Sequence, residues 1–231
     1  MKYTKTMLRA LALSFFTMAF TACEKEGNIT NGQTEEVQEF NADNLKGWIT
    51  EAEAEAEASE LGQKSIGEVR TVPFVDLARY TGRWFELAKF PTFFGVGCTC
   101  TTAEYGVVPE GVSVFNNCFV PQSGINSSIE GIATVADAVT NAKLKVQFPQ
   151  TPFPSDYWII DLIENEENTP YEFSVVSNSD RTSLFILSRK PQIKTFQQKR
   201  SIIKILIGLI SQGYDLSKIE LTPQSGTCVY P

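Results

Sequence analysis

Apolar and polar positions alternate along most of the chain. From Thr71 onward, short runs rich in β-branched and aromatic residues are separated by Gly and Pro, a pattern typical of half-buried strands. Pro109-Glu110-Gly111 favours a hairpin turn, and residues 137–141 favour another loop. Eight strands at this even spacing predict an antiparallel sandwich or an up-and-down barrel. The predicted strands are Trp84–Phe90, Thr99–Val108, Gly111–Val120, Ser128–Ala136, Lys143–Phe148, Tyr157–Ile163, Glu172–Ser177 and Leu184–Ser188.

The periodicity changes towards the C-terminus. Between Thr195 and Gln212, Ile and Leu recur at the spacing of one helix face, and basic side chains fall on the other face. Gly213 ends this pattern, and a short final strand is predicted at Ile219–Thr222. The basic residues leave two interpretations open, a helix on a membrane surface or an amphipathic helix packed outside the barrel. We expect the second.

The N-terminus has the pattern of an export signal. Basic residues precede the apolar stretch Ala10–Phe20, which is too short to span a bilayer. The tetrapeptide Phe20-Thr21-Ala22-Cys23 resembles the lipobox of bacterial lipoproteins, although Phe20 stands where Leu is preferred. We therefore expect residues 1–22 to be a lipoprotein signal peptide and Cys23 to carry the lipid, palmitate included. The alternative is an ordinary signal peptide with a cysteine near its end.

Residues 23–70 are acidic, with twelve Asp and Glu against four Lys and Arg, and large apolar residues are sparse. The run Glu51–Ala58 alternates Glu and Ala, which are helix formers, but its like charges disfavour a long helix in isolation. The segment predicts a flexible acidic tether with a transient helix around Asn44–Leu61. Cation binding or partner docking by the acidic run is the alternative. The folded domain is then 71–231.

Composition narrows the function. The chain has 20 Lys and Arg against 27 Asp and Glu, a formal net charge of −7. This balance argues against nucleic-acid binding, which needs a basic surface. The absence of His excludes His-containing catalytic triads, His-ligated haem and zinc sites that need imidazole. We expect no cofactor and no metal.

Five cysteines are an odd number for an exported chain. If Cys23 carries lipid, the other four can form two disulfides in an oxidising compartment. Three pairings of Cys98, Cys100, Cys118 and Cys228 are possible, and the residues alone do not choose among them.

Several segments together resemble the lipocalin family. Tyr80-Thr81-Gly82-Arg83-Trp84-Phe85-Glu86 resembles the first lipocalin signature and Leu184–Arg189 resembles the third. Cys100–Tyr105 resembles the second strand, and Ala142–Val146 and Tyr157–Asp161 resemble the fifth and sixth. The middle signature is weaker, with Thr169-Pro170-Tyr171 where the family often has Thr-Asp-Tyr. The resemblance covers nearly all of 71–231 and is nearest to bacterial outer-membrane lipoprotein lipocalins and apolipoprotein D-like lipocalins.

The resemblance implies an all-β fold, an eight-stranded antiparallel up-and-down barrel with a C-terminal α-helix packed outside and a short final strand. It implies that Arg189 lies on Trp84 in a structural cation–π contact at one end of the barrel. It also implies the disulfides Cys100–Cys228 and Cys98–Cys118. Cys100–Cys118 with Cys98–Cys228 remains the alternative.

The inward phase of lipocalin strands implies a set of cavity-lining residues. Its side chains are mainly apolar and small, which suits a ligand with a long apolar body and one polar end, such as a fatty acid or lysophospholipid. An inward Glu86 disfavours a carboxylate nearby, so a charged head group should lie at the barrel mouth. On the third strand Val112 and Val114 are also apolar, and a slip of one residue exchanges the two faces. The implied set is Glu86, Ala88, Ala103, Tyr105, Phe115, Asn117, Ile129, Gly131, Ala133, Leu144, Val146, Phe148, Tyr157, Ile159, Phe185 and Leu187.

The expected function is a non-enzymatic, lipid-anchored lipocalin that binds a small hydrophobic ligand for lipid storage, transport or membrane maintenance. Glu24 after Cys23, rather than Asp, favours the outer membrane. One alternative is an enzyme that uses Glu86 and Asp161 as acid and base. The other is an interaction module with a filled barrel and an exposed apolar loop at Pro91–Val96.

Overall fold

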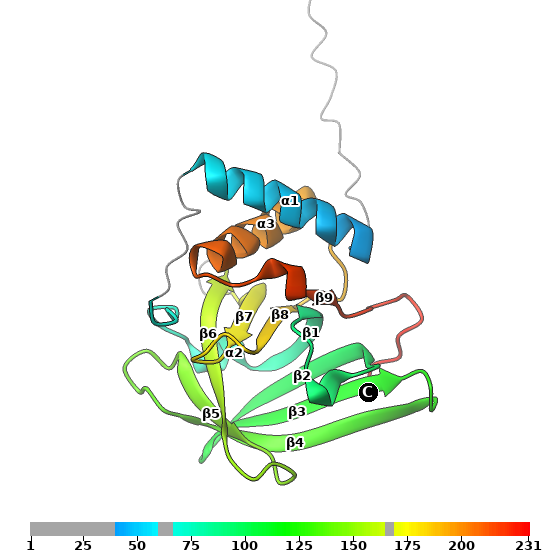
Figure 1. Cartoon of the computed structure of the whole chain (residues 1–231). Coiled ribbons are helices and arrows are strands. Elements are labelled where there is room, and N and C mark those ends of the chain that lie inside the picture. Colours follow the sequence, from blue (N-terminus) through cyan, green and yellow to red (C-terminus); the bar gives the residue numbers. More distant parts are fainter. Residues whose placement is uncertain (1–39, 60–66, 165–168) are drawn as a thin grey trace, which may run out of the picture. The chain divides into compact units, whose positions relative to one another are not determined.

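The computed structural model describes residues 40–59, 67–164 and 169–231. The predicted signal peptide, Cys23 and residues 24–39 and 60–66 therefore lie outside the described residues. The described residues form nine strands in the order β2-β3-β4-β5-β6-β7-β8-β1-β9, and an additional β1–β2 pairing closes the first eight into an antiparallel barrel (Figure 1). The strands are β1 Gly82–Lys89, β2 Thr99–Val108, β3 Gly111–Val120, β4 Ile125–Val135, β5 Lys143–Gln147, β6 Ser155–Ile163, β7 Phe173–Ser177, β8 Leu184–Ser188 and β9 Glu220–Leu221. The predicted barrel is confirmed.

Strand register determines which residues face the barrel interior. Directly opposite residues on antiparallel neighbours share one face of the sheet. Tyr105 lies opposite Val114, which lies opposite Gly131. Two residues further along, Ala103, Asn116 and Ile129 form the next such row. These rows belong to the inner wall, because Tyr105, Val114 and Ala103 are part of the buried cluster that fills the barrel.

Helix α3, Phe196–Ser211, packs on the outside of the barrel. Thr195 and Gln198 form a capping box at its start, which satisfies backbone N–H groups that the first turn leaves without partners. Its buried apolar residues join a cluster with outward-facing strand residues such as Leu87, Ile160 and Ile186. The predicted position of the helix is therefore confirmed, and its apolar face is buried against strands. Within the described part of the chain, no helix has the length and apolar character needed to cross a bilayer.

Helix α1, Ala42–Ala58, confirms that a helix forms near the predicted Asn44–Leu61 but corrects the prediction that this part of 23–70 is a flexible tether. Leu45, Trp48, Ala52 and Ala56 are buried along one face, and the first three of them join the same outer cluster as α3. Figure 1 shows α1 lying along α3. The small alanines let the two helices approach closely, so tertiary packing stabilises a helix that would be marginal alone.

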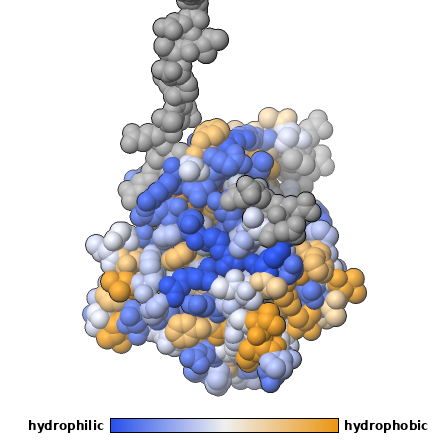
Figure 2. All heavy atoms as spheres, turned by 180° about the vertical axis from the view of Figure 1, so that it is seen from behind, coloured by the Kyte–Doolittle hydropathy of each residue, from blue (hydrophilic) through white to orange (hydrophobic). Residues whose placement is uncertain are grey.

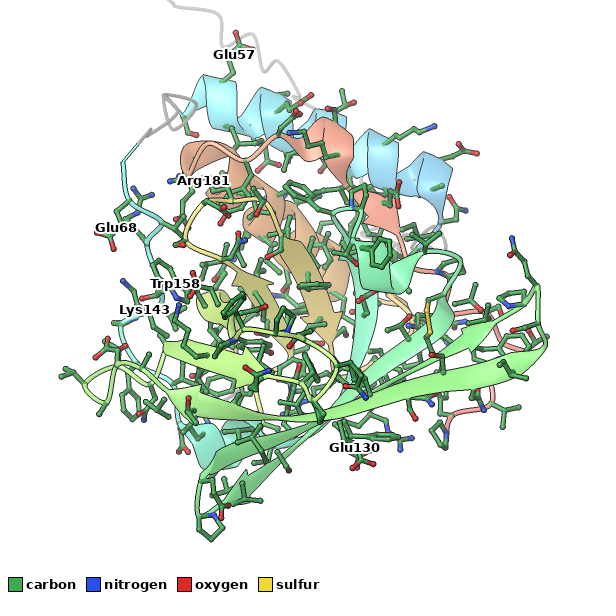
Figure 3. All side chains as sticks on the ribbon, turned by 60° about the horizontal axis from the view of Figure 1, so that its bottom comes forward. Glu57, Glu68, Glu130, Lys143, Trp158 and Arg181 are labelled. Carbon is green, nitrogen blue, oxygen red and sulfur yellow. A yellow bond between two sulfur atoms is a disulfide. The ribbon has the colours of Figure 1, made fainter. Side chains whose placement is uncertain are left out.

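Charge complementarity also holds α1 against α3. Glu55 accepts a hydrogen bond of 2.6 Å from Arg200, and Glu51 pairs with Lys199 at 2.9 Å. The Arg200 guanidinium lowers the pKa of Glu55 through this hydrogen bond. The basic face of α3 therefore neutralises part of the like charge that disfavoured this helix in isolation. Glu57, in contrast, projects away from the barrel (Figure 3).

Candidate functional site

One end of the barrel is closed by a cation–π contact. The guanidinium carbon of Arg189 lies 3.9 Å from the centroid of the fully buried Trp84 ring. This is the contact that the lipocalin resemblance implies. The guanidinium also donates to backbone carbonyl oxygens, those of Arg79 (2.9 Å), Tyr80 (3.2 Å), Arg83 (2.8 Å) and Tyr171 (3.2 Å). These hydrogen bonds connect β1 and β8 to the short helix α2, Leu77–Tyr80. This end of the barrel is therefore closed, and we call it the floor of the barrel.

The part of the interior directly above this closed end is nearly filled by side chains. It holds a cavity of about 10 Å³, lined by Leu77, Tyr80, Tyr105, Val112, Val114, Ala133, Leu144, Tyr157 and Ile159. A space of this size is at the lower limit for one water molecule. The tyrosine rings occupy much of the closed half. Higher up, Phe148 lies so close to Gly131 that an added Cβ there would stand 2.7 Å from the phenyl ring. In this closed half of the described barrel, a lipid-sized ligand must displace side chains.

Three tyrosine hydroxyl groups meet inside the barrel. The Tyr157 hydroxyl donates to that of Tyr105 at 2.9 Å. The hydroxyl of Tyr80 lies 2.8 Å from that of Tyr157 and 2.9 Å from the Ser174 hydroxyl. Burial raises the pKa of Tyr80 to about 12, and it also raises the pKa of Tyr105 and of Tyr157 well above the ordinary value. All three hydroxyl groups therefore keep their protons at neutral pH, and the network is uncharged.

Glu86 is a buried carboxylate with partners. It lies opposite Leu187, on the inner side of β1. Its carboxylate pairs with Lys89 at 3.0 Å and accepts a hydrogen bond of 2.6 Å from the Thr222 hydroxyl. Lys89 also donates to the Gly95 carbonyl at 3.2 Å. The charge that Glu86 brings into the barrel is thus balanced locally.

The hypothesis of a Glu86–Asp161 acid–base pair is wrong for this structure. Asp161 lies on the outer side of β6, where its carboxylate oxygen is 3.7 Å from the Cβ position of Gly208 on α3. Burial raises the pKa of Asp161. The two carboxyl groups therefore lie on opposite sides of the barrel wall and cannot act on one substrate.

Most of the residues that the resemblance implied for the cavity lie on the inner wall. Strand register and the interior cluster place thirteen of them there. They are Glu86, Ala103, Tyr105, Ile129, Gly131, Ala133, Leu144, Val146, Phe148, Tyr157, Ile159, Phe185 and Leu187.

The expectation that Ala88 lines the cavity is wrong. A bulge between Glu86 and Ala88 shifts the register of β1 against β8. Both Leu87 and Ala88 consequently belong to the outer cluster beneath α3. Simple alternation along the strand does not anticipate this bulge.

The expectation that Phe115 and Asn117 line the cavity is also wrong, because both lie on the outer face of β3. Phe115 lies opposite Glu104 and Glu130, so it is on the outer face of β3. Figure 3 shows Glu130 pointing away from the barrel interior. The inner positions of β3 are Val112, Val114 and Asn116, one residue out of phase with the expectation. The apolar side chains of Val112 and Val114 were the sequence signal that these positions, rather than Phe115 and Asn117, face the interior. Asn116 and Tyr80 are inner residues that sequence reasoning missed.

The four described cysteines form Cys98–Cys118 and Cys100–Cys228, the pairing that the resemblance implies. None of the described residues therefore offers a free thiol for catalysis. The described residues also contain no cluster of three or more acidic or cysteine side chains able to hold a metal ion.

Comparisons with known proteins agree with this geometry. A family model described as "Lipocalin-like domain" matches residues 75–224. Temperature-induced lipocalin-1 of Arabidopsis thaliana is 34% identical over 172 residues, covering 69% of this chain and 85% of the relative. Outer membrane lipoprotein Blc of Escherichia coli (strain K12) is 33% identical, with the same coverage. Apolipoprotein D of Cavia porcellus is 31% identical, and the alignment covers 75% of this chain and 89% of the relative.

Solved structures show the same fold at low identity. Insecticyanin from the tobacco hornworm Manduca sexta aligns with a TM-score of 0.54 at 20% identity, over 71% of this chain and 88% of that chain. Lobster apocrustacyanin A1 aligns with a TM-score of 0.51 at 14% identity, over 71% of this chain and 96% of that chain. These two likenesses concern the fold alone.

Proposed function

Because the chain belongs to the lipocalin family, we propose that it is a non-enzymatic carrier that binds one small hydrophobic ligand inside its barrel. The observation that carries this proposal is the inner wall, a closed ring of strands lined by apolar side chains above a sealed floor. The outer surface supports the interior as the site. Figure 2 shows separate hydrophobic patches around a hydrophilic band, rather than one continuous apolar face on that side.

Ligand entry requires a modest rearrangement of side chains. Phe148 and Phe185 are only half-buried, although they pack against the interior cluster. Their rotation would open the upper half of the barrel without breaking a strand pairing. Each buried methylene contributes about 0.8 kcal/mol, so ten of them offer about 8 kcal/mol before the costs of binding and of displacing side chains. Because about 8 kcal/mol corresponds to a Kd of about 1 μM, these costs make binding of such a chain weaker than that limit unless more methylenes are buried.

The second part of the proposal is a lipid anchor at Cys23, in an exported protein of the outer membrane. Two disulfides suit an oxidising compartment. The relatives named Outer membrane lipoprotein Blc, from Escherichia coli and Vibrio cholerae, support this location. The mass of the protein extracted from its host membrane tests the anchor. We expect diacyl and acyl groups on Cys23, lost together with membrane association in Cys23→Ser; an unmodified Cys23 would contradict it.

An interaction module with a filled barrel is the second candidate. The small size of the cavity favours it, as do Phe93 and Val96, which are 90% and 78% exposed in the loop between β1 and β2. In that function the loop would contact a partner protein, and the barrel would serve only as a scaffold.

Native mass spectrometry separates these two functions. The protein is recorded before and after exposure to a bacterial phospholipid and fatty-acid extract. We expect one adduct of a few hundred daltons, lost in Ile129→Trp on the inner face of β4 and kept in Ile132→Trp on its outer face. A bare protein mass in every sample would overturn the carrier and favour the interaction module.

A further inference from the structure

Three connections between strands lie at the mouth of the barrel, the end opposite the floor. Neighbouring strands run antiparallel, so β1, β3, β5 and β7 all run from the floor to the mouth. The connections β1–β2, β3–β4 and β5–β6 are therefore at the mouth, and we call residues 90–98, 121–124 and 148–154 the mouth loops. The Cys98–Cys118 disulfide links the first mouth loop to β3 close to the second.

Large apolar side chains are exposed on all sides of these loops. Phe93 and Val96 in the first mouth loop are almost fully exposed, and Phe153 in the third is 76% exposed. Ile125, which begins β4 directly after the second mouth loop, is 60% exposed. Exposed apolar side chains that gather at one end of a molecule mark a contact with another apolar surface.

The sequence around the mouth loops has no charged residue over three long runs. Asp, Glu, Lys and Arg make up 20% of the chain, but none of them occurs in 90–103, 111–129 or 146–155. Phe74 and Val139 are exposed near the floor as well, but every strand connection there carries charged residues. Only the mouth loops can therefore enter an apolar phase without burying a charge.

The charged groups nearest to the mouth loops have partners. Lys89, directly before the first loop, is buried and pairs with Glu86 at 3.0 Å. The fourth connection at this end, 178–183, contains charged residues, and its Arg181 donates to the backbone carbonyl of Gln212 at 2.8 Å. The uncharged surface thus comprises three of the four connections at the mouth.

We propose that the mouth loops dock on a phospholipid bilayer and insert their exposed apolar side chains at its surface. This inference rests on the proposed function, since it names the membrane as the partner of a tethered lipid carrier. Phe40 follows the proposed anchor at Cys23 by 17 residues. That length spans at most about 60 Å, more than the diameter of about 40 Å of a domain of this size, so the anchor permits the mouth to face the bilayer. An acyl chain could then pass between bilayer and barrel without crossing water.

Apolar burial, rather than charge, drives this docking. The net charge of −7 disfavours approach to an anionic surface, and the mouth loops offer no cation to lipid phosphates. Exposed basic residues such as Lys204 lie on α3 instead. We therefore expect a weak contact that is insensitive to salt. The tether raises the local concentration of the bilayer and keeps this weak contact in place.

Flotation with phosphatidylcholine vesicles tests the docking. The test chain begins at residue 23 and carries Cys23→Ser, so it keeps every described residue and carries no acyl group. We expect binding at about 1 mM lipid that changes less than about twofold between about 0.1 and about 0.5 M NaCl. The double variant Phe93→Ser with Phe153→Ser should lower the partition coefficient at least about tenfold, because two phenyl groups no longer leave water.

Matched variants near the floor are the controls. Phe74→Ser and Val139→Ser also remove exposed apolar side chains, and each should keep the partition coefficient within about twofold of the parent chain. Gln150→Glu places a charge on the third mouth loop and should weaken binding at least about fivefold. Every variant should bind the fluorescent probe N-phenyl-1-naphthylamine as the parent does, which shows that its barrel is folded.

The docking would be overturned by the absence of vesicle binding, which would favour a partner protein at the mouth loops. Equal losses in the mouth and floor variants would overturn it too. Stronger binding to vesicles that contain phosphatidylglycerol would assign the contact to the basic residues of α3. A dimer in light scattering that Phe93→Ser dissociates would mean that a second copy covers the mouth. All four results leave the carrier intact if the lipid extract still gives an adduct; without that adduct, the proposed function fails as well.

Discussion

The guanidinium of Arg189, near the end of β8, covers the ring of Trp84 at the start of β1 at 3.9 Å. Chain segments more than one hundred residues apart thus meet at the closed end of the barrel. The same guanidinium donates hydrogen bonds to the backbone carbonyl oxygens around it. The first prediction concerns this contact. Arg189→Met leaves those carbonyls without donors and should lower the free energy of unfolding by about 3–5 kcal/mol. Urea unfolding followed by far-UV circular dichroism measures the loss.

Lys218→Met is the control for that experiment. Lys218 is exposed and pairs with Asp215 at 3.7 Å, so its loss should change stability by no more than about 0.5 kcal/mol. Similar small losses in both variants would mean that the floor of the barrel does not depend on Arg189.

The second prediction concerns the docking of α1. Trp48 is buried against α3, and its replacement by Ala removes about 3–5 kcal/mol of packing from a helix that is marginal by itself. Trp48→Ala should therefore raise amide hydrogen exchange in 42–58 by at least about a hundredfold while the barrel amides stay protected. Glu57→Ala, on the solvent side of α1, should leave the exchange unchanged. Exchange in α1 that does not respond to Trp48→Ala would contradict its docking.

The third prediction is a pH dependence of stability. Burial of Asp161 against α3 raises its folded-state pKa above 3.8. The folded state then binds a proton that the unfolded state has released, so this group destabilises the fold increasingly as the pH rises from 3.8 through the folded pKa. Asp161→Asn should raise the free energy of unfolding at pH 7 and should give no such gain at pH 3. Denaturant titrations at the two pH values measure this difference.

The carboxyl group of Asp137 has a lowered pKa, so its effect on stability at neutral pH is opposite to that of Asp161. The Thr140 hydroxyl and the Val139 backbone N–H donate to its carboxylate and lower its pKa. Its contribution is present above 3.8 and is lost as the pH falls through the folded pKa. Asp137→Asn should therefore destabilise the chain at pH 7. Stabilisation by Asp137→Asn, or none by Asp161→Asn, would contradict this assignment.

The fourth prediction concerns the side chain that limits access to the barrel. Phe148 rests against Gly131 and narrows the upper half of the interior. Phe148→Ala should bind the fluorescent probe N-phenyl-1-naphthylamine about fivefold to thirtyfold more tightly, because the probe no longer displaces a phenyl ring. Phe153→Ala removes an exposed phenyl ring from the same connection between β5 and β6 and should not change the affinity. Equal affinities of the Phe148→Ala and wild-type chains would show that the ring does not limit binding.

The sequence predicts the strands well because each has a local signal. Alternation and turn residues place the hairpin at Pro109–Gly111, and the motif around Trp84 fixes the start of the barrel. Which alternate residues of β3 face the barrel interior has no such local signal, because both faces of this strand carry apolar residues. The bulge after Glu86 has no local signal either, since it arises where β1 leaves β2 and pairs with β9.

The docking of α1 and the polar interior depend on contacts between distant segments. The apolar stripe of α1 is thin, with one Trp and one Leu among alanines, and its stability comes from α3. The tyrosine network joins Tyr80 before β1 to residues on β2 and β6. No spacing along the chain predicts that their hydroxyl groups meet, because the barrel fold alone brings these three segments together.

The most direct test of the account is the position of a ligand in the protein. Crystals of the protein grown with 10-bromodecan-1-ol would give an anomalous signal from the bromine and electron density for the alkyl chain that carries it. We predict that the bound molecule lies inside the barrel, among the side chains of its inner wall. Bromine found only on the outer surface, with the interior still filled by Phe148 and the three tyrosines, would contradict the central claim that the barrel is the binding site.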